Sequence, residues 1–318
     1  MHRILTVIVN YRTAALTADC LRSLAEERRR AELAVVVVDN ASGDGSAGRI
    51  AALIAAEGWG GWVRLEARGA NDGFAAGNNA GVRAAAGWAD DADLIWLLNP
   101  DTVVRPGAAA ALAGFLRAHP GCGIAASRLE HADGEPQRSA FRFPSVAGEF
   151  ENGIRSGPVS RVLSRYVVAP PVADRPHPAD WAAGASMMIR RGVWDALGGM
   201  DAGYFLYFEE TDFCRRAAEA GWATWYVPAS RVVHLVGRST GVTGADRSRR
   251  RMPRYWFESR RRYFVRHLGR FRTGLADAAW SIGFALWTVR RWVQGLPEHE
   301  PPGLLGDFVR FSLRPDGP

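Results

Sequence analysis

Two acidic positions follow directly on apolar runs, and both could do chemistry. Asp101 ends the stretch D-L-I-W-L-L-N-P-D, in which five consecutive apolar residues, Leu94 to Leu98, fit a strand buried on both faces. Pro100 cannot donate to a sheet ladder, so the strand stops and delivers the Asp101 carboxylate to the carboxyl end of a central strand. Open α/β sheets bind ligands at that edge. Taken alone, this stretch favours an ordinary Asn-Pro-Asp turn.

The second acidic position is a cluster at the start of a predicted helix. Glu209, Glu210 and Asp212 come directly after the aromatic run Tyr204–Phe208. Three carboxylates at a helix start favour the helix dipole, which is a purely structural role. A helix start beside apolar residues can also hold a carboxylate as a general base, and two adjacent glutamates raise the pKa of one of them. We therefore take these three acids as candidate catalytic residues.

The first hundred residues predict the scaffold for these acids. Strands are expected at 4–10, 35–38 and 62–66, with helices between them, and this alternation indicates βαβ units and a parallel sheet. The stretch 69–81 is dense in glycine and asparagine and is predicted to be a loop. It is not a G-x-G-x-x-G following a strand, so the dinucleotide fingerprint is absent.

Beyond Asp101 the pattern is less regular. A helix is expected at 106–119, a strand at 123–127, an edge strand at 137–143 and a strand of small residues at 181–189. The stretch 145–178 contains five prolines and is predicted to be a loop-like insert. His234 follows two valines, and a lone histidine of this kind is more often structural than a ligand.

Composition bounds the class of protein. The chain has 318 residues, of which 47% are apolar and 23% charged, as in a folded globular protein. Its three cysteines, Cys20, Cys122 and Cys214, share no metal-ligand spacing, and we expect buried reduced thiols. His2-Arg3 leads straight into a strand rather than into the apolar segment of a signal peptide, so a cytoplasmic location is expected.

Positive charge is concentrated near the C-terminus. Eleven arginines and one acid, Glu258, lie between Arg247 and Arg272, so this segment carries more positive charge than the net +7 of the whole chain. Amphipathic helices are expected at 255–268 and 275–293, and the second is too short and too polar to span a bilayer. Two interpretations remain open: the helices pack on the preceding domain, or they lie on an anionic membrane, which the tryptophans and basic charge favour.

The order of short motifs along residues 4–240 resembles that of family 2 glycosyltransferases, and in particular the rhamnosyltransferase-like enzymes of bacterial cell-surface polysaccharide assembly. The motifs are V-I-V-N-Y, V-V-V-D-N-A-S, N-D-G-F-A-A-G-N-N-A-G, L-L-N-P-D, W-A-A-G-A, G-G-M-D, Y-F-E-E-T-D-F-C-R-R and H-L-V-G-R-S. The resemblance implies an α/β protein of the GT-A fold, with a mixed, mostly parallel central sheet flanked by helices. It implies a nucleotide-sugar half at 1–105, an acceptor half at 106–240 and, at 241–318, a basic, Trp-rich helical extension.

The resemblance also assigns roles to residues. Asp39 takes the place of the aspartate that contacts the base or ribose, and 71–79 that of the segment closing over the donor. The matching donor positions are Asn10, Tyr11, Asp39, Asn40, Ser42, Asn71, Gly73, Phe74, Asn79, Asn99 and Asp101. Trp181 and Gly184 match the acceptor side.

The resemblance implies a divalent cation, Mg²⁺ or Mn²⁺, at Asp101 and His234. Asp101 matches the last acid of the D-x-D metal motif, while Asn99 stands where its first acid would be. Glu210 matches the catalytic base, a position that is usually aspartate. One base without a second carboxylate placed as a nucleophile is the layout of an inverting transferase, whereas hydrolysis needs a paired acid.

The resemblance therefore predicts transfer of a sugar, rhamnose by likeness, from a nucleoside-diphosphate sugar to a glycan or lipid-linked acceptor. One alternative is a nucleotidylyltransferase, which normally carries a Gly-rich basic loop after the first strand that is absent at Asn10–Thr13. Another is a catalytically impaired nucleotide-sugar-binding module, supported by the departures at Asn99 and Glu210. The arginines would suit nucleic acid, but no recognition motif accompanies them.

Overall fold

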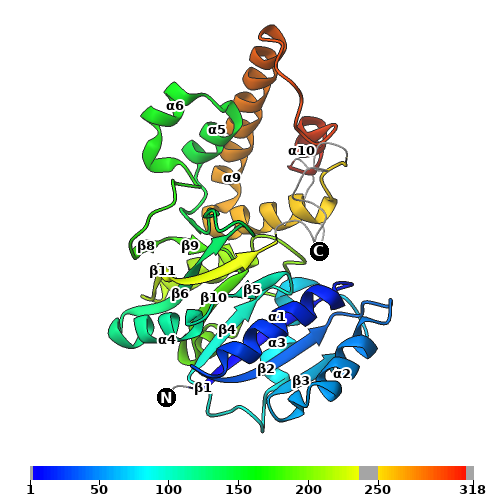
Figure 1. Ribbon diagram of the computed structural model, residues 1–318. Coiled ribbons are helices and arrows are strands. Elements are labelled where there is room, and N and C mark those ends of the chain that lie inside the picture. Colours follow the sequence, from blue (N-terminus) through cyan, green and yellow to red (C-terminus); the bar gives the residue numbers. More distant parts are fainter. Residues whose placement is uncertain (1–2, 236–249, 313–318) are drawn as a thin grey trace. The chain divides into compact units, whose positions relative to one another are not determined.

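The computed structural model describes residues 3–235 and 250–312 (Figure 1). The end of the last predicted motif, the predicted boundary at 240 and the beginning of the basic segment lie outside the described residues. The chain forms two compact units. The first comprises Met1–Phe141, Pro171–Phe205 and Glu209–Ser239, and the second Arg142–Pro170, Leu206–Phe208 and Thr240–Pro318.

The first unit is built on one large sheet. Its amino-terminal half contains four parallel strands, β1 (Arg3–Asn10), β2 (Glu32–Asp39), β3 (Val63–Ala67) and β4 (Leu94–Leu98). All five residues of β4 are buried, as the apolar run predicted. Because β1 and β2 pair in parallel with Asn10 opposite Asp39, both side chains reach the same edge of the sheet.

The other half of the sheet is mixed. It consists of β10 (Ser186–Arg190), β6 (Cys122–Glu130), β11 (Ala223–His234), β5 (Thr102–Val104) and β8 (His177–Ala179). In the described residues the strand order is β3-β2-β1-β4-β10-β6-β11-β5, with β8 also paired to β11. β10 runs antiparallel to both β4 and β6, which brings the chain back beside the end of β4.

Helices flank this sheet in Figure 1. They are α1 (Ala14–Glu27), α2 (Ser46–Ala56), α3 (Gly73–Ala84), α4 (Ala108–Ala118), α7 (Arg191–Leu197) and α8 (Glu209–Glu219). Trp96 is fully buried, and the three cysteines are buried free thiols, as expected. Burial raises the pKa of Cys20 and of Cys214 to about 12.

The prediction of a loop at 69–81 was wrong beyond Asp72, because α3 begins at Gly73. Glycines, which weaken a helix in isolation, are needed here at Gly77 and Gly81 for close packing on β1. A Cβ added at Gly81 would stand only 2.4 Å from Cγ1 of Val7. Tertiary packing therefore stabilises a helix that local propensity disfavours.

Two further predictions need correction. The edge strand expected at 137–143 is reduced to β7 (Ala140–Phe141), which pairs with β9 (Trp181–Ala182) in a separate small sheet. The insert at 145–178 is not loop-like throughout, because it contains α5 (Val146–Ile154) and α6 (Gly157–Val162). The Ser145 hydroxyl caps α5 by accepting a hydrogen bond from the Gly148 amide at 3.1 Å, a local signal that the prolines obscured.

The second unit is helical. It contains α5, α6, α9 (Arg254–Val293) and α10 (Leu304–Ser312), and α9 is interrupted at Gly269, which has φ 77° and ψ 162°. The buried Arg260 holds the two parts of α9 and α5 together, since its guanidinium lies 2.5 Å from Asp277 and 2.7 Å from Glu149. In the described part of the chain, no helix is both long and apolar enough to cross a membrane.

Candidate active site

The ends of β1 and β2 form a buried polar cluster. Asn10 Nδ2 donates to Asp39 Oδ1 at 2.6 Å, and the Ser42 hydroxyl donates to the same oxygen at 2.6 Å. The Ser42 amide donates to Asp39 Oδ2 at 3.1 Å. Asp39 is therefore held in one orientation as a hydrogen-bond acceptor at the edge of the sheet, as a residue that recognises a nucleoside hydroxyl or base needs to be.

Two arginines that the sequence analysis missed complete this end of the site. Arg12 has a φ of 58°, and its amide and Nε donate to the Ser42 hydroxyl and carbonyl, both at 2.9 Å. Arg68 Nη1 donates to Asn40 Oδ1 at 2.7 Å. The only sequence signal for either is a basic residue just beyond a strand end. The aromatic ring of Tyr11 lies beside Arg12 and is partly exposed.

Asn40 connects the carboxyl end of β2 to the start of α3. Its Nδ2 donates to Asn71 Oδ1 at 2.8 Å and to the Gly73 carbonyl at 3.1 Å. Gly73 has a φ of 92°, and the next amide, that of Phe74, donates to the Phe205 carbonyl at 2.8 Å. The start of α3 is thus fixed both to the β2 end and to the segment that precedes α8.

Asp101 and His234 meet at the carboxyl end of β4. His234 Nε2 lies 3.5 Å from Asp101 Oδ1, and Asn99 Nδ2 lies 3.5 Å from the same imidazole nitrogen. The Asp101 carbonyl accepts the Leu235 amide at 2.9 Å, which sets β11 beside the end of β4. Among the described residues, no group of three or more His, Cys, Asp or Glu side chains is arranged to hold a metal ion. Asp101 and His234 therefore offer two candidate ligand side chains, a carboxylate and an imidazole.

Glu210 and Phe74 both lie against Gly184. A Cβ added at Gly184 would stand 3.4 Å from Cε1 of Phe74 and 3.7 Å from Cβ of Glu210. The Glu210 carboxylate accepts hydrogen bonds from the amides of Gly184 and of Glu210 itself. The adjacent Ala185 carbonyl accepts the Asn99 amide at 3.1 Å. The predicted base, the acceptor-side glycine and the end of β4 are therefore neighbours.

The acids of α8 have different environments. Burial raises the pKa of Glu210. Burial also raises the pKa of Glu209 well above its ordinary value, and the neighbouring Glu210 raises it further. Asp212 is instead paired with Arg216, whose Nε lies 2.7 Å from its carboxylate. The sequence predicted a raised pKa from the two adjacent glutamates, whereas the structure adds burial as the larger cause.

Two predicted positions make contacts of their own. Asn79 lies on α3 and uses its amide for both backbone groups of Met200, at 2.7 and 2.9 Å, so it holds the Gly-Gly-Met turn. Trp181 stacks on Phe141 with ring centroids 4.2 Å apart.

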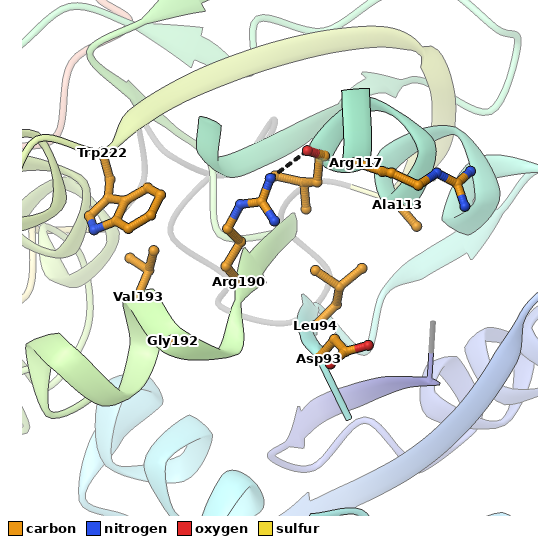
Figure 2. Close-up of a pocket in the computed structure, with 9 residues that line it drawn as sticks. Asp93, Leu94, Ala113, Arg117, Arg190, Gly192, Val193 and Trp222 are labelled. Atoms are coloured by element: carbon orange, nitrogen blue, oxygen red, sulfur yellow. Dashed lines mark hydrogen bonds between the residues drawn. The ribbon is translucent and has the colours of Figure 1, made fainter. Parts of the chain in front are cut away.

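A cavity of about 270 Å³ lies at the opposite end of β4 (Figure 2). Asp93 and Leu94 from the amino end of β4 line it, together with Arg190 and Trp222. Arg190 donates a hydrogen bond to the Leu116 carbonyl, so it closes the end of α4. None of the predicted site residues lines this cavity.

The mixed sheet, with a buried polar cluster at the ends of β1 and β2 and acids after β4 and at the start of α8, has the architecture of the GT-A fold. A family model described as "Glycosyltransferase like family 2" matches residues 2–254. The chain belongs to this family and is a glycosyltransferase.

The curated relatives include rhamnosyltransferases. The N-acetylglucosaminyl-diphospho-decaprenol L-rhamnosyltransferase of Mycobacterium tuberculosis is 30% identical over 234 residues, which cover 69% of this chain and 71% of the relative. The rhamnosyltransferase WbbL of Escherichia coli is 42% identical over 55 residues, covering 17% of this chain and 21% of that one. Among solved structures, the mannosyltransferase PcManGT from Pyrobaculum calidifontis, in complex with GDP-Man and Mn²⁺, has a TM-score of 0.56 at 17% identity, covering 92% of this chain and 75% of its own.

Proposed function

We propose that this glycosyltransferase moves rhamnose from a nucleoside-diphosphate sugar to a hydroxyl of a lipid-linked glycan, with inversion at the anomeric carbon. The observation that carries the proposal is the placement of Glu210 against Gly184, one residue from the Ala185 carbonyl that binds the Asn99 amide. Glu210, the proton acceptor, and Asn99, which we place nearest the leaving phosphate, are thereby both held by the backbone segment Gly184–Ala185. The rhamnose and the lipid-linked acceptor are carried over from the name of the mycobacterial relative.

We assign the donor to residues 1–105 and the acceptor to 106–240. Asp39, held by Asn10 and Ser42, recognises the nucleoside. Asn40, Asn71 and the start of α3 enclose the donor from the other side.

The chemical step needs a base for the acceptor hydroxyl. Glu210 is half-buried and its pKa is raised, so its ionised form is a stronger proton acceptor than that of an exposed glutamate. Glu209 is buried, and burial together with the neighbouring Glu210 raises its pKa well above the ordinary value, which disfavours the ionised form that a base needs. Asp212 is paired with Arg216 of the same helix. One active base and no carboxylate nucleophile give inversion.

The diphosphate leaving group needs compensation for its growing charge. The carboxylate of Asp101 and the imidazole of His234, 3.5 Å apart, are of the types that bind Mn²⁺ or Mg²⁺, and these two residues would hold the cation. The donor set therefore fits a divalent cation. A cation bound there would offset the negative charge that develops on the leaving diphosphate.

We further propose that the second part of α9 lies on an anionic membrane surface, where a lipid-linked acceptor is presented. Six exposed apolar side chains recur there at helical spacing, and we call them the apolar stripe: Phe271, Leu275, Ile282, Leu286, Val289 and Val293. At 3.6 residues per turn they fall within about 60° of one another.

The opposite face of this helix is covered within the second unit. Thr273, Ala276 and Trp280 are buried, and the Trp280 ring stacks on Phe308 at 4.1 Å. The stripe is thus an additional apolar face, and Arg272 beside it is exposed. An apolar stripe beside arginines suits the interface of an anionic bilayer better than a second protein surface. We place the enzyme peripherally at the cytoplasmic face of the plasma membrane.

A donor screen tests the proposed reaction. Hydrolysis of nucleotide-sugars is measured without acceptor, with and without Mn²⁺, for the wild type and for Glu210→Gln. We expect dTDP-rhamnose to be the preferred donor. Equal rates for all nucleotide-sugars would refute the proposed donor. Binding of nucleotide with no turnover in any condition would refute the proposed reaction and favour a binding module.

A further inference from the structure

Three arginines converge on one buried carboxylate beside the site, and we call them the arginine triad. Arg231 Nε and Nη2 lie 2.5 and 3.1 Å from the two Glu130 oxygens. Arg128 Nε lies 3.1 Å and Arg105 Nε 3.8 Å from the same carboxylate. The Glu130 side chain is fully buried, and its carboxylate contacts all three arginines.

The triad carries more charge than the fold requires. Arg231 alone makes a bidentate pair with Glu130, which neutralises the buried acid. Apart from Glu130, the acid paired with these two arginines in the described part of the chain is Asp174, which lies 3.5 Å from Arg128 and has a side chain that is 94% exposed. The buried Nε groups of Arg105 and Arg128 make no hydrogen bond among the described residues, although both lie within ion-pair distance of Glu130. The Arg105 and Arg128 side chains are 43% and 21% exposed, so an anion can reach them, and it would reduce the repulsion between the guanidinium groups.

The three side chains share one face of the sheet. Arg231 is the register partner of Arg128, and the Arg105 amide donates to the Arg231 carbonyl at 3.0 Å. Leu129 and Val232, which alternate with the triad along β6 and β11, belong to the apolar core with Leu112 of α4. Because side chains alternate across a strand, the triad faces away from α4.

The same face carries the catalytic helix α8. Cys214 of α8 contacts Met187 of β10, and Met187 is the register partner of Ala126, two residues before Arg128. Gln137 connects the residues around Glu130 to His234 of the Asp101–His234 pair. Its Nε2 donates to the Glu130 carbonyl at 3.0 Å and to the His234 carbonyl at 2.8 Å. The triad therefore borders the acceptor side of the site.

We propose that Arg105 and Arg128, supported by Arg231, bind the diphosphate of the lipid-linked acceptor. The inference rests on the proposed function and adds the group that the acceptor presents. Planar guanidinium groups match phosphate oxygens in bidentate geometry, and two of them facing one anion suit a diphosphate. The donor diphosphate belongs at Asp101 and His234, so the triad serves a second diphosphate.

Calorimetric titration with farnesyl diphosphate tests this, in the presence of saturating dTDP to fill the donor site. The double variant Arg105→Gln/Arg128→Gln removes two donors but leaves Arg231 to neutralise Glu130. We expect its affinity for farnesyl diphosphate to fall on the order of tenfold to a hundredfold, with dTDP affinity unchanged. Arg105→Lys/Arg128→Lys retains the charge and should lose less. Arg22→Gln, an exposed arginine of α1, is the matched control and should bind as the wild type does.

Each contrary result overturns the proposal. An equal loss of dTDP affinity would assign the triad to the donor diphosphate, and no loss with either ligand would reduce it to a surface ion network. If Arg105→Gln/Arg128→Gln unfolds, Arg105→Gln alone, which removes the longest of the three contacts to Glu130, must still weaken farnesyl diphosphate binding. Binding needs no turnover and the titration contains no nucleotide-sugar, so this result does not depend on which sugar the enzyme transfers.

Discussion

The backbone amide of Asn99 donates a hydrogen bond to the carbonyl of Ala185 at 3.1 Å, and this bond joins the end of β4 to the segment that supports the base. Asp101 lies two residues after Asn99, and Glu210 rests on Gly184, the residue before Ala185. The two acids that are distant in the chain are therefore placed by adjacent residues of one backbone segment.

Replacement of Glu210 by Gln should lower the transfer rate by about 10²–10⁴-fold while nucleotide affinity stays unchanged, because only proton removal is lost. Burial raises the Glu210 pKa, so the active ionised form increases as pH rises through that raised value. The acidic limb of kcat/KM against pH should thus lie above the range of an ordinary glutamate and disappear in Glu210→Gln. An unchanged turnover in the variant would remove Glu210 from the mechanism.

Replacement of Glu209 by Gln should stabilise the protein near neutral pH. Its folded-state pKa is raised, mainly by burial, so between the ordinary and the raised value the folded state binds a proton that the unfolded state lacks. Stability from this group is full at low pH and is lost as pH rises through the raised pKa. Urea unfolding of wild type and variant from pH 4 to 8 should show a flatter curve for Glu209→Gln. A steeper loss of stability in the variant would contradict this.

Replacement of Asn10 by Ala should cost about 2–4 kcal/mol of stability, since the change leaves buried polar groups without partners. Asn10 Oδ1 accepts from the Thr13 and Thr17 hydroxyls at 3.0 and 2.9 Å, and Nδ2 supports Asp39. Nucleotide affinity should fall as well, because Asp39 loses its orientation. Denaturant unfolding and calorimetry measure the two effects, and the exposed amide of Gln294 provides the control in Gln294→Ala.

Replacement of Gly73 by Ala should impair both folding and catalysis. A Cβ there would stand 2.0 Å from the Phe205 carbonyl oxygen, and the φ of 92° is itself strained for an L residue. Relief of the clash displaces the segment that leads to Glu209. Gly69→Ala, where a Cβ meets nothing within 4 Å, is the matched control. We expect a lower Tm and a lower kcat for Gly73→Ala alone; identical behaviour of the two variants would show that this contact is unimportant.

Replacement of Ile282, Leu286 and Val289 together by Gln should reduce sedimentation with anionic vesicles without unfolding the protein. All three side chains are exposed, so their replacement removes little packing within the protein. It does remove apolar contact with the bilayer. The control variant carries Val162→Gln and Val309→Gln, two exposed valines on α6 and α10. Equal vesicle binding by both variants would exclude the apolar stripe as a membrane surface.

Sequence alone was sufficient for the elements whose signal is local. The apolar run before Asp101, the alternation of strands and helices, and the acids at the start of α8 each depend on neighbouring residues, so they could be predicted. The order of motifs identified the family and the GT-A fold, and the family model confirmed the family.

Tertiary structure alone decided the features that depend on contact between distant segments. The helix at Gly73–Ala84 exists because its glycines fit against β1, and α5 packs so closely on α9 that a Cβ added at Gly153 would stand 2.6 Å from the Trp280 carbonyl oxygen. The arginine triad likewise has no sequence signature, because Arg105, Arg128 and Arg231 become neighbours only through the pairing of β5, β6 and β11. Local propensity contains no information about which strands will pair, and strand pairing is what places these charges side by side.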